Sequence, residues 1–135
     1  MHPKTQELQA RTRRFAVSIF SFCEGLPQTI VAQRIVPQLI DSAGSTDSNY
    51  RAACRARSKA EFIAKLGVAI EEADEAQGWL RLLVESNLAT SEQAAPLIQE
   101  ADELLSIFIR SRKTAETRKA EQERLDRETA RRRAK

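Results

Sequence analysis

The segment FIAKLGVAIEEADEAQGWLRLL, residues 62–83, carries apolar side chains at a regular helical spacing. Its apolar positions recur at alternating steps of four and three residues: Phe62, Leu66, Ala69, Ala73, Ala76, Leu80 and Leu83. Such a row follows one face of an α-helix and packs at a low angle against antiparallel neighbours. Ile63 and Ile70 widen the row into a core-facing stripe. The segment therefore predicts a long helix in a helical bundle.

We expect this helix to begin near the segment STDSN, residues 45–49, and to end near Ser86. Ser, Thr, Asp and Asn side chains cap helix N-termini, and Gly44 is a natural C-terminal stop for a preceding helix. That preceding helix is predicted over about 28–43, where Pro37 should remove a backbone hydrogen bond and kink it. A first helix is predicted over about 5–24, with one face formed by Leu8, Phe15, Ile19 and Phe22.

The segment TSEQ, residues 90–93, has the form of a capping box and predicts the start of a fourth helix. Apolar residues then recur at heptad spacing: Ala94, Leu97, Ile98, Ala101, Leu104, Leu105 and Phe108. Pro96 indicates either an irregular first turn or a regular helix that starts near Ala95. With short connections, the simplest fold is an all-α, antiparallel up-down-up-down four-helix bundle over residues 1–113, followed by a charged tail.

Composition agrees with one helical domain, since 135 residues contain only 4 Gly, 4 Pro and 5% aromatic residues. Cys23 and Cys54 belong to no C-x-x-C pair, which fits a reducing compartment, and we expect a cytoplasmic protein. The apolar stretch after Arg14 is short and has no cleavage site after it, so we do not expect a secretion signal. No stretch approaches the roughly 20 apolar residues of a membrane span, so no membrane association is expected.

Positive charge is concentrated at the C-terminal end. Residues 110–135 hold 11 Lys/Arg and 5 Asp/Glu, whereas residues 1–109 hold 11 and 14. A localised basic segment indicates a polyanionic partner, RNA or DNA. The candidate nucleic-acid contacts are Arg110, Arg112, Lys113, Arg118, Lys119, Arg131, Arg132, Arg133 and Lys135. Because residues 114–135 contain no aromatic side chain to stack a base, binding should be weakly sequence-selective; the alternative is a solvated extension, which can be helical but cannot bury itself.

The residues for catalysis are scarce, so we expect a non-enzymatic protein without a cofactor. His2 is the only histidine and the four glycines are isolated, which excludes Ser-His and Cys-His nucleophiles and a phosphate-binding glycine loop. Four carboxylates at 71, 72, 74 and 75 could ligate a divalent cation. They lie on more than one helical face, so ion pairing is the preferred interpretation, and no metal is expected. Counter-charges, on neighbouring antiparallel or symmetry-related surfaces, are expected from cations upstream on the same predicted helix: Arg51, Arg55, Arg57, Lys59 and Lys65.

Three further residues of this region need an interpretation of their own. Glu61 lies four residues from Arg57 and from Lys65, which predicts two opposite-charge pairs. Trp79 lies beside the apolar row, so we expect it to pack within the bundle, with an oligomer contact as the alternative. Cys54 is interpreted as a small buried apolar group rather than a nucleophile.

The run NYRAACRARSKAEFIAKLGVAIEEADEAQGWLRLL, residues 49–83, closely resembles the signature of the bacterial four-helix-bundle proteins found as reading frames inside 23S rRNA intervening sequences. The segments QLIDSA (38–43) and ELLSIFI (103–109) extend the resemblance, which covers most of residues 5–113 and omits the tail. The chain departs from the usual pattern at Pro37, at Asp41, where a basic residue is expected, and in the segment STDS (45–48).

The resemblance implies a cytoplasmic bundle that assembles as a cyclic homopentamer. Some relatives are accessory proteins of diversity-generating retroelements, which implies contacts with nucleic acid and with a protein partner such as a reverse transcriptase. The alternative function is therefore a structural protein that docks such a partner. The candidate residues for assembly are those of the family motif: Asn49, Tyr50, Arg51, Arg55, Arg57, Ser58, Glu61, Phe62, Lys65, Glu71, Glu72, Asp74, Glu75 and Trp79.

Overall fold

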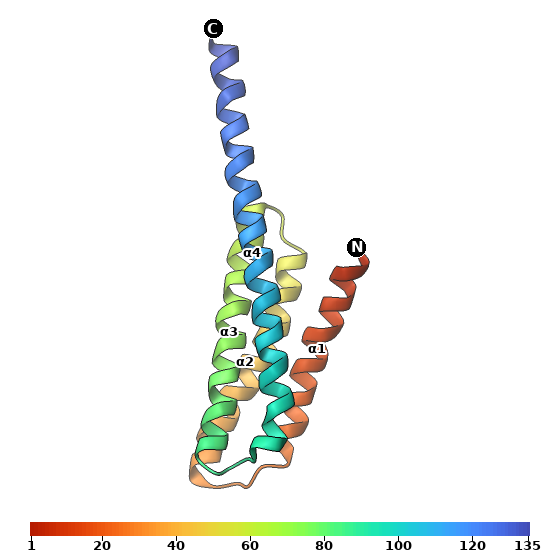
Figure 1. The fold of residues 1–135 in the computed structure, drawn as a ribbon, viewed down its shortest axis with the longest axis vertical. Helices are drawn as coiled ribbons and strands as arrows, with labels where there is room; N and C mark the ends of the chain where they lie inside the picture. Colours follow the sequence, from red (N-terminus) through yellow and green to blue (C-terminus); the bar gives the residue numbers. More distant parts are fainter.

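The computed structural model describes residues 1–135 and contains four α-helices and no strand. The helices are α1 (Pro3–Glu24), α2 (Ile30–Cys54), α3 (Lys59–Glu85) and α4 (Ser91–Ala134). Short loops join them at alternate ends of the molecule, so consecutive helices run in opposite directions (Figure 1). The protein is an all-α four-helix bundle, which confirms the predicted fold class. None of the four helices contains an apolar stretch of the length that a membrane span requires.

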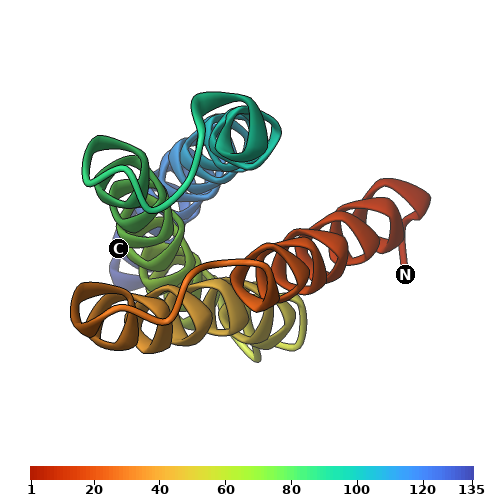
Figure 2. The ribbon, with the colours of Figure 1, turned by 90° about the horizontal axis from the view of Figure 1, so that it is seen from below.

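The four helices are packed unequally. Helix α2 packs against both α1 and α3, and α4 packs against α3, whereas α1 makes only a small contact with α4 and none with α3. Seen from below, α1 lies against α2 and diverges from the α3–α4 pair (Figure 2). The outer surfaces of α1 and α3 are therefore separate faces of the molecule.

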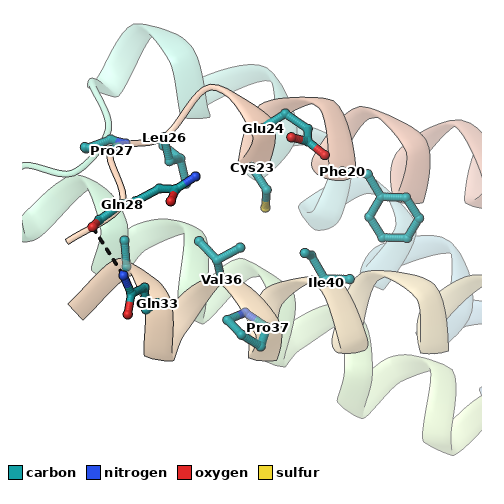
Figure 3. Close-up of a pocket in the computed structure, with 11 residues that line it drawn as sticks. Phe20, Cys23, Glu24, Leu26, Pro27, Gln28, Gln33, Val36, Pro37 and Ile40 are labelled. Carbon is teal, nitrogen blue, oxygen red and sulfur yellow. Dashed lines mark hydrogen bonds between the residues drawn. The ribbon is translucent and has the colours of Figure 1, made fainter. Parts of the chain in front are cut away.

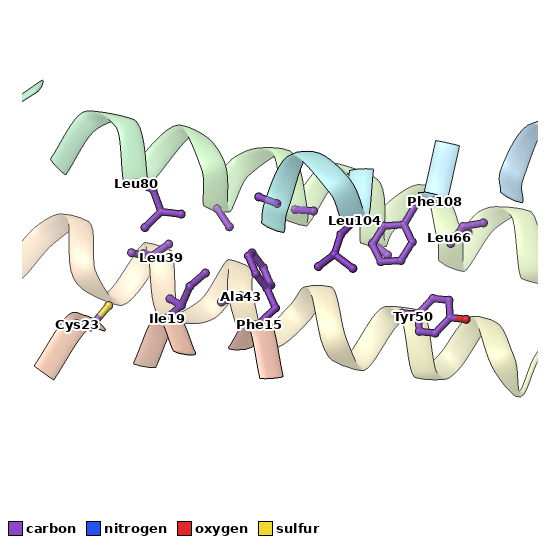
Figure 4. Close-up of a cluster of buried hydrophobic side chains, with 14 of the residues drawn as sticks. Phe15, Ile19, Cys23, Leu39, Ala43, Tyr50, Leu66, Leu80, Leu104 and Phe108 are labelled. Atoms are coloured by element: carbon purple, nitrogen blue, oxygen red, sulfur yellow. The ribbon is translucent and has the colours of Figure 1, made fainter. Parts of the chain in front are cut away.

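The core contains one continuous cluster of small and branched side chains from all four helices (Figure 4). Leu66 and Leu80 of the predicted row are fully buried, as are its alanines, and Phe62 is half-buried. Leu104 and Phe108 of α4, Phe15 and Ile19 of α1 and Leu39 of α2 also belong to the cluster. The alanines bring the helix backbones close together, and burying each large aliphatic or aromatic side chain stabilises the fold by about 1.5–3 kcal/mol. The predicted apolar rows are thus confirmed.

The boundary between the second and third helices was predicted wrongly. Helix α2 continues unbroken through Pro37, Gly44 and the STDSN segment (45–49) to Cys54, and the chain turns only at residues 55–58. The polar side chains of this region bond backward instead of capping: Thr46 Oγ1 donates to the Ser42 carbonyl (2.8 Å) and Asn49 Nδ2 donates to the Ser45 carbonyl (2.9 Å). Such bonds satisfy the hydroxyl and amide groups within an uninterrupted helix.

The cap of α3 lies at Ser58. Its Oγ accepts from the N–H of Glu61 (3.0 Å), and the Glu61 carboxylate accepts from the N–H of Arg57 (3.3 Å). At the other end, Asn87 has φ 60° and the N–H of Leu88 bonds to the Leu83 carbonyl (2.9 Å), which closes the helix with a left-handed residue.

The predicted capping box of α4 is confirmed by reciprocal bonds between Thr90 and Gln93 (2.9 and 3.1 Å). The expected irregularity at Pro96 is wrong. The helix begins at Ser91, and Pro96 lies exposed within it.

Candidate nucleic-acid interface and assembly surfaces

The C-terminal part of α4 leaves the bundle and projects into solvent as a continuous helix (Figure 1). Phe108 is the last buried residue of α4. Three ion pairs at i,i+4 spacing hold this segment: Arg112–Glu116 (3.7 Å), Lys119–Glu123 (2.5 Å) and Arg124–Glu128 (2.9 Å). The Lys119 ammonium lowers the pKa of the Glu123 carboxyl, because it bonds to and attracts the charged form. We call residues 110–134 the projecting helix.

The nine predicted nucleic-acid contacts lie along the projecting helix or directly after it. Arg112 and Lys119 are engaged with acids of their own helix. Arg110 donates through Nε to the Ser106 carbonyl (3.2 Å) and has no acid partner. The other six predicted cations form no ion pair within the chain: Lys113, Arg118, Arg131, Arg132, Arg133 and Lys135. The structure thus gathers these cations on one exposed element.

The predicted assembly residues are divided between two helices and a loop. Asn49, Tyr50 and Arg51 lie on α2, and Arg55, Arg57 and Ser58 lie at or after its end, so the expectation of a single helix is wrong. The expected side-chain pairs of Glu61 with Arg57 and Lys65 do not form, and Arg57 reaches Glu61 only through its backbone N–H. For Arg57 the cause is the chain turn, which places this residue before the first helical residue of α3.

Tyr50 has a structural role. It is buried, and its ring stacks on Phe108 with the ring centroids 5.4 Å apart. Burial raises the pKa of the Tyr50 hydroxyl, and a hydrogen bond with Cys54 contributes in the same direction. Cys54 is half-buried, whereas Cys23 is buried; neither forms a disulfide. Tyr50, Arg57, Ser58 and Phe62 line an open cavity of about 490 Å³ at the base of the projecting helix, together with Thr5 and Ser111.

Asp47 is the centre of a polar network between α1 and α2 that the sequence did not indicate. Its carboxylate accepts from Thr12 Oγ1 (2.8 Å) and from Arg51 Nε (3.1 Å), and Arg13 lies 3.8 Å away. Its side chain is 14% exposed. Only the spacing of Asp47 and Arg51 was visible in the sequence, since Thr12 belongs to another helix. The network therefore fixes the register of α1 on α2.

A second polar link joins α1 to α4. The Arg11 guanidinium bonds to the Glu100 carboxylate through two nitrogens (2.5 and 3.2 Å). The Glu100 hydrogen bond raises the pKa of Arg11, so the guanidinium stays charged. This bidentate pair bridges α1 and α4, which make the smallest contact of the packed helix pairs.

The four carboxylates of α3 do not converge. Glu71, Asp74 and Glu75 are exposed, and the structure holds no group of three or more His, Cys, Asp and Glu side chains placed to bind a metal ion. Glu72 is half-buried between α3 and α2, and burial raises its pKa, with Glu75 adding repulsion. The predicted counter-charges at 55, 57, 59 and 65 form no ion pair within this chain. The turn at 55–58 separates Arg55 and Arg57 from α3.

Trp79 belongs to a surface row on α3. It is half-buried, packs against the core cluster and donates from Nε1 to Glu75 Oε1 (3.1 Å). Val68 and Leu82, which are 38% and 44% exposed, lie on the same helical face at heptad-related spacing. We call Val68, Glu75, Trp79 and Leu82 the α3 outer row.

An apolar groove opens between α1 and α2 (Figure 3). It has a volume of about 580 Å³, and Phe20, Val36, Pro37 and Ile40 contribute its apolar walls. Phe20 is 38% and Ile40 36% exposed, so large apolar side chains face solvent in this chain. Burial raises the pKa of the Cys23 thiol, which also lines the groove, to about 11. We call this surface the α1–α2 groove.

An all-α four-helix bundle with one helix prolonged into solvent is the class of protein that these observations define. Residues 4–110 match the family model of the 23S rRNA-intervening sequence protein, and the chain belongs to this family. The match ends where the projecting helix begins.

A solved structure is also similar. The crystal structure of a protein of unknown function from the S23 ribosomal protein family of Bacteroides thetaiotaomicron VPI-5482 has a TM-score of 0.72 and 29% sequence identity. The similarity covers 82% of this chain and 98% of that chain. A comparison with curated proteins finds no match.

Proposed function

We propose that the protein is a non-enzymatic, oligomeric four-helix bundle that associates with nucleic acid, with RNA as the first ligand to test. The observation that carries this proposal is the projecting helix. It holds cations without acid partners on an element that no other part of the chain covers. Phosphate binding requires clustered, accessible cations and supplies most of the affinity of weakly selective nucleic-acid binding.

Self-association is supported by two separate apolar surfaces, one between α1 and α2 and the other on the outer face of α3. The α1–α2 groove exposes Phe20 and Ile40, and the α3 outer row exposes Val68 and Leu82. A closed ring requires two different surfaces that meet head to tail, whereas a two-fold dimer requires one. This arrangement agrees with a cyclic homopentamer, the assembly implied by the family resemblance. The α3 carboxylates and the unpaired Arg55 and Arg57 can then pair across the subunit contact.

Sedimentation equilibrium of the full chain tests the assembly. We expect a mass of several times 15.2 kDa at micromolar concentration. Ile40→Asp should lower that mass, because it places a charge in the α1–α2 groove. Leu125→Asp is the matched control, since Leu125 is 42% exposed on the projecting helix, away from the groove. A wild-type monomer contradicts the proposed assembly.

Gel-shift titration with a duplex and a single-stranded RNA at two salt concentrations tests the ligand. We expect binding that weakens steeply as salt increases, since released counterions drive it. A protein that binds no nucleic acid at low salt contradicts the proposed ligand. That result favours the alternative, a structural protein that docks a protein partner such as a reverse transcriptase.

A further inference from the structure

The cations of the projecting helix are not distributed evenly around its axis. Seven positions that alternate by three and four residues follow one face of the helix: Arg110, Lys113, Thr117, Ala120, Arg124, Arg127 and Arg131. Steps of three and four residues keep a row on one side of a helix with 3.6 residues per turn. Five of these seven residues are cations and none is an acid. We call them the cationic row.

None of the five acids of the projecting helix occupies a position of this row: Glu116, Glu121, Glu123, Asp126 and Glu128. Glu128 nevertheless lies on the same face, because it is about five helical turns from Arg110. Two of the three ion pairs, Arg112–Glu116 and Lys119–Glu123, also lie outside it, so they neutralise charge on other faces. Arg124 is the exception, since it bonds to Glu128 (2.9 Å). Both partners are about half exposed, so this pair contributes little and can exchange for a phosphate.

We propose that the projecting helix binds a nucleic-acid duplex along the cationic row, with Arg110, Lys113, Arg124, Arg127 and Arg131 contacting phosphates. This inference rests on the proposed nucleic-acid association and specifies its surface. It adds Arg124 and Arg127, which the sequence did not single out. It also excludes Arg112, Arg118 and Arg133, which lie on the opposite side of the helix.

The dimensions of the row fit a duplex. From residue 110 to residue 131 the helix rises about 32 Å, at roughly 1.5 Å per residue. A duplex carries about one negative charge per 1.7 Å of its axis, so the stretch of duplex beside a row of this length carries many phosphates, which wind around it. The five cations are exposed. The absence of an aromatic residue in this segment favours backbone contact over base stacking.

Because salt screens charges, the contribution of a cation to phosphate binding should depend on which face of the helix it occupies. An α-helix with its side chains is about 10–12 Å across, and the Debye length is about 8 Å at physiological ionic strength. A cation on the far side is therefore more than one Debye length from the phosphates. Removing it should change the affinity far less than removing a cation of the row.

Two triple variants with equal charge changes test the proposal. The row variant combines Arg124→Gln, Arg127→Gln and Arg131→Gln, and the control variant combines Arg112→Gln, Arg118→Gln and Arg133→Gln. Arginine and glutamine have similar helix propensities, and circular dichroism checks that both variants keep their helix. The probes are RNA and DNA duplexes of 24 base pairs, titrated at several salt concentrations.

The logarithm of the association constant falls as the logarithm of the salt concentration rises. We expect the row variant to reduce the magnitude of this slope by about 2.7, since each of its three lost phosphate contacts contributes about 0.9. The control variant should lower it by less than about 1. Equal losses in the two variants would overturn the cationic row while leaving nucleic-acid association in place. Absence of binding by the wild-type protein overturns the proposed ligand itself, and a preference for single strands overturns the duplex.

Discussion

Replacing Gly44 by alanine should stabilise the protein, because Gly44 lies in the interior of α2. No glycine of the chain has positive φ, and a Cβ at this position would meet the Phe20 ring at 3.8 Å, an ordinary contact. Alanine is favoured over glycine inside a helix by about 0.8–1.0 kcal/mol, partly because it restricts the unfolded chain. The free energy of unfolding should therefore increase by about 1 kcal/mol.

Whether Gly44→Ala raises or lowers the free energy of unfolding shows which of two backbone conformations Gly44 adopts. If Gly44 instead ended a helix, as its sequence context predicted, and did so in the left-handed conformation, alanine would cost about 1–2 kcal/mol. Urea unfolding followed by circular dichroism measures the difference. Both proteins must be compared at one concentration, because the stability of an oligomer depends on it.

Gly78→Ala is the matched control, since Gly78 lies in α3 and a Cβ there would meet no atom within 4 Å. It should stabilise the protein by a similar amount. A loss of stability in Gly44→Ala, together with a gain in Gly78→Ala, would refute the continuous α2 and restore a helix boundary at residue 44.

Three further predictions concern the polar network, the projecting helix and the groove. Asp47→Ala should lower the free energy of unfolding by about 2 kcal/mol, because Thr12 and Arg51 lose a charged acceptor; chemical denaturation measures it. Removing residues 114–135 should change that free energy by less than about 0.5 kcal/mol, since no residue there is buried, while gel shifts show most RNA affinity lost. Cys23 should react slowly with iodoacetamide at pH 8 and faster as the pH approaches 11, because burial raises its pKa to about 11 and only the thiolate reacts; mass spectrometry at Cys23 measures the rate, and rapid labelling at pH 8 would contradict the burial.

Most of the fold could be predicted because it depends on local periodicity. The apolar rows of α3 and α4 and the Thr90–Gln93 capping box are properties of short segments, and the structure confirms them. The α2–α3 boundary could not be predicted in the same way, since serine, threonine and asparagine side chains can either cap a helix or bond back to the preceding turn. The segment from Ser58 to Glu61 held the correct signal, a serine three residues before a glutamate.

The candidate site was predictable only in part. The basic character of the C-terminal end is a property of the sequence, but the face on which each cation lies depends on the helix being continuous from Ser91 to Ala134. The shape of the α1–α2 groove depends on how α1 packs against α2. The contacts that set this packing join residues far apart in the sequence, Phe20 with Gly44 and Thr12 with Asp47. Periodicity within one helix does not specify such contacts, so Phe20 and Ile40 could not be identified as exposed.

The bundle and the projecting helix are coupled through helix nucleation. An isolated charged helix of this length is marginal in water, because its first turn orders several residues for one hydrogen bond. Here the buried part of α4, up to Phe108, has already formed those turns, and the extension only propagates them. Its three i,i+4 ion pairs then contribute about 0.2–0.5 kcal/mol each. The cationic row is consequently held at a fixed angle to the bundle. In a ring, several such rows would be presented together. One long polyanion could then bind several rows at once, which would increase its affinity without any new kind of contact.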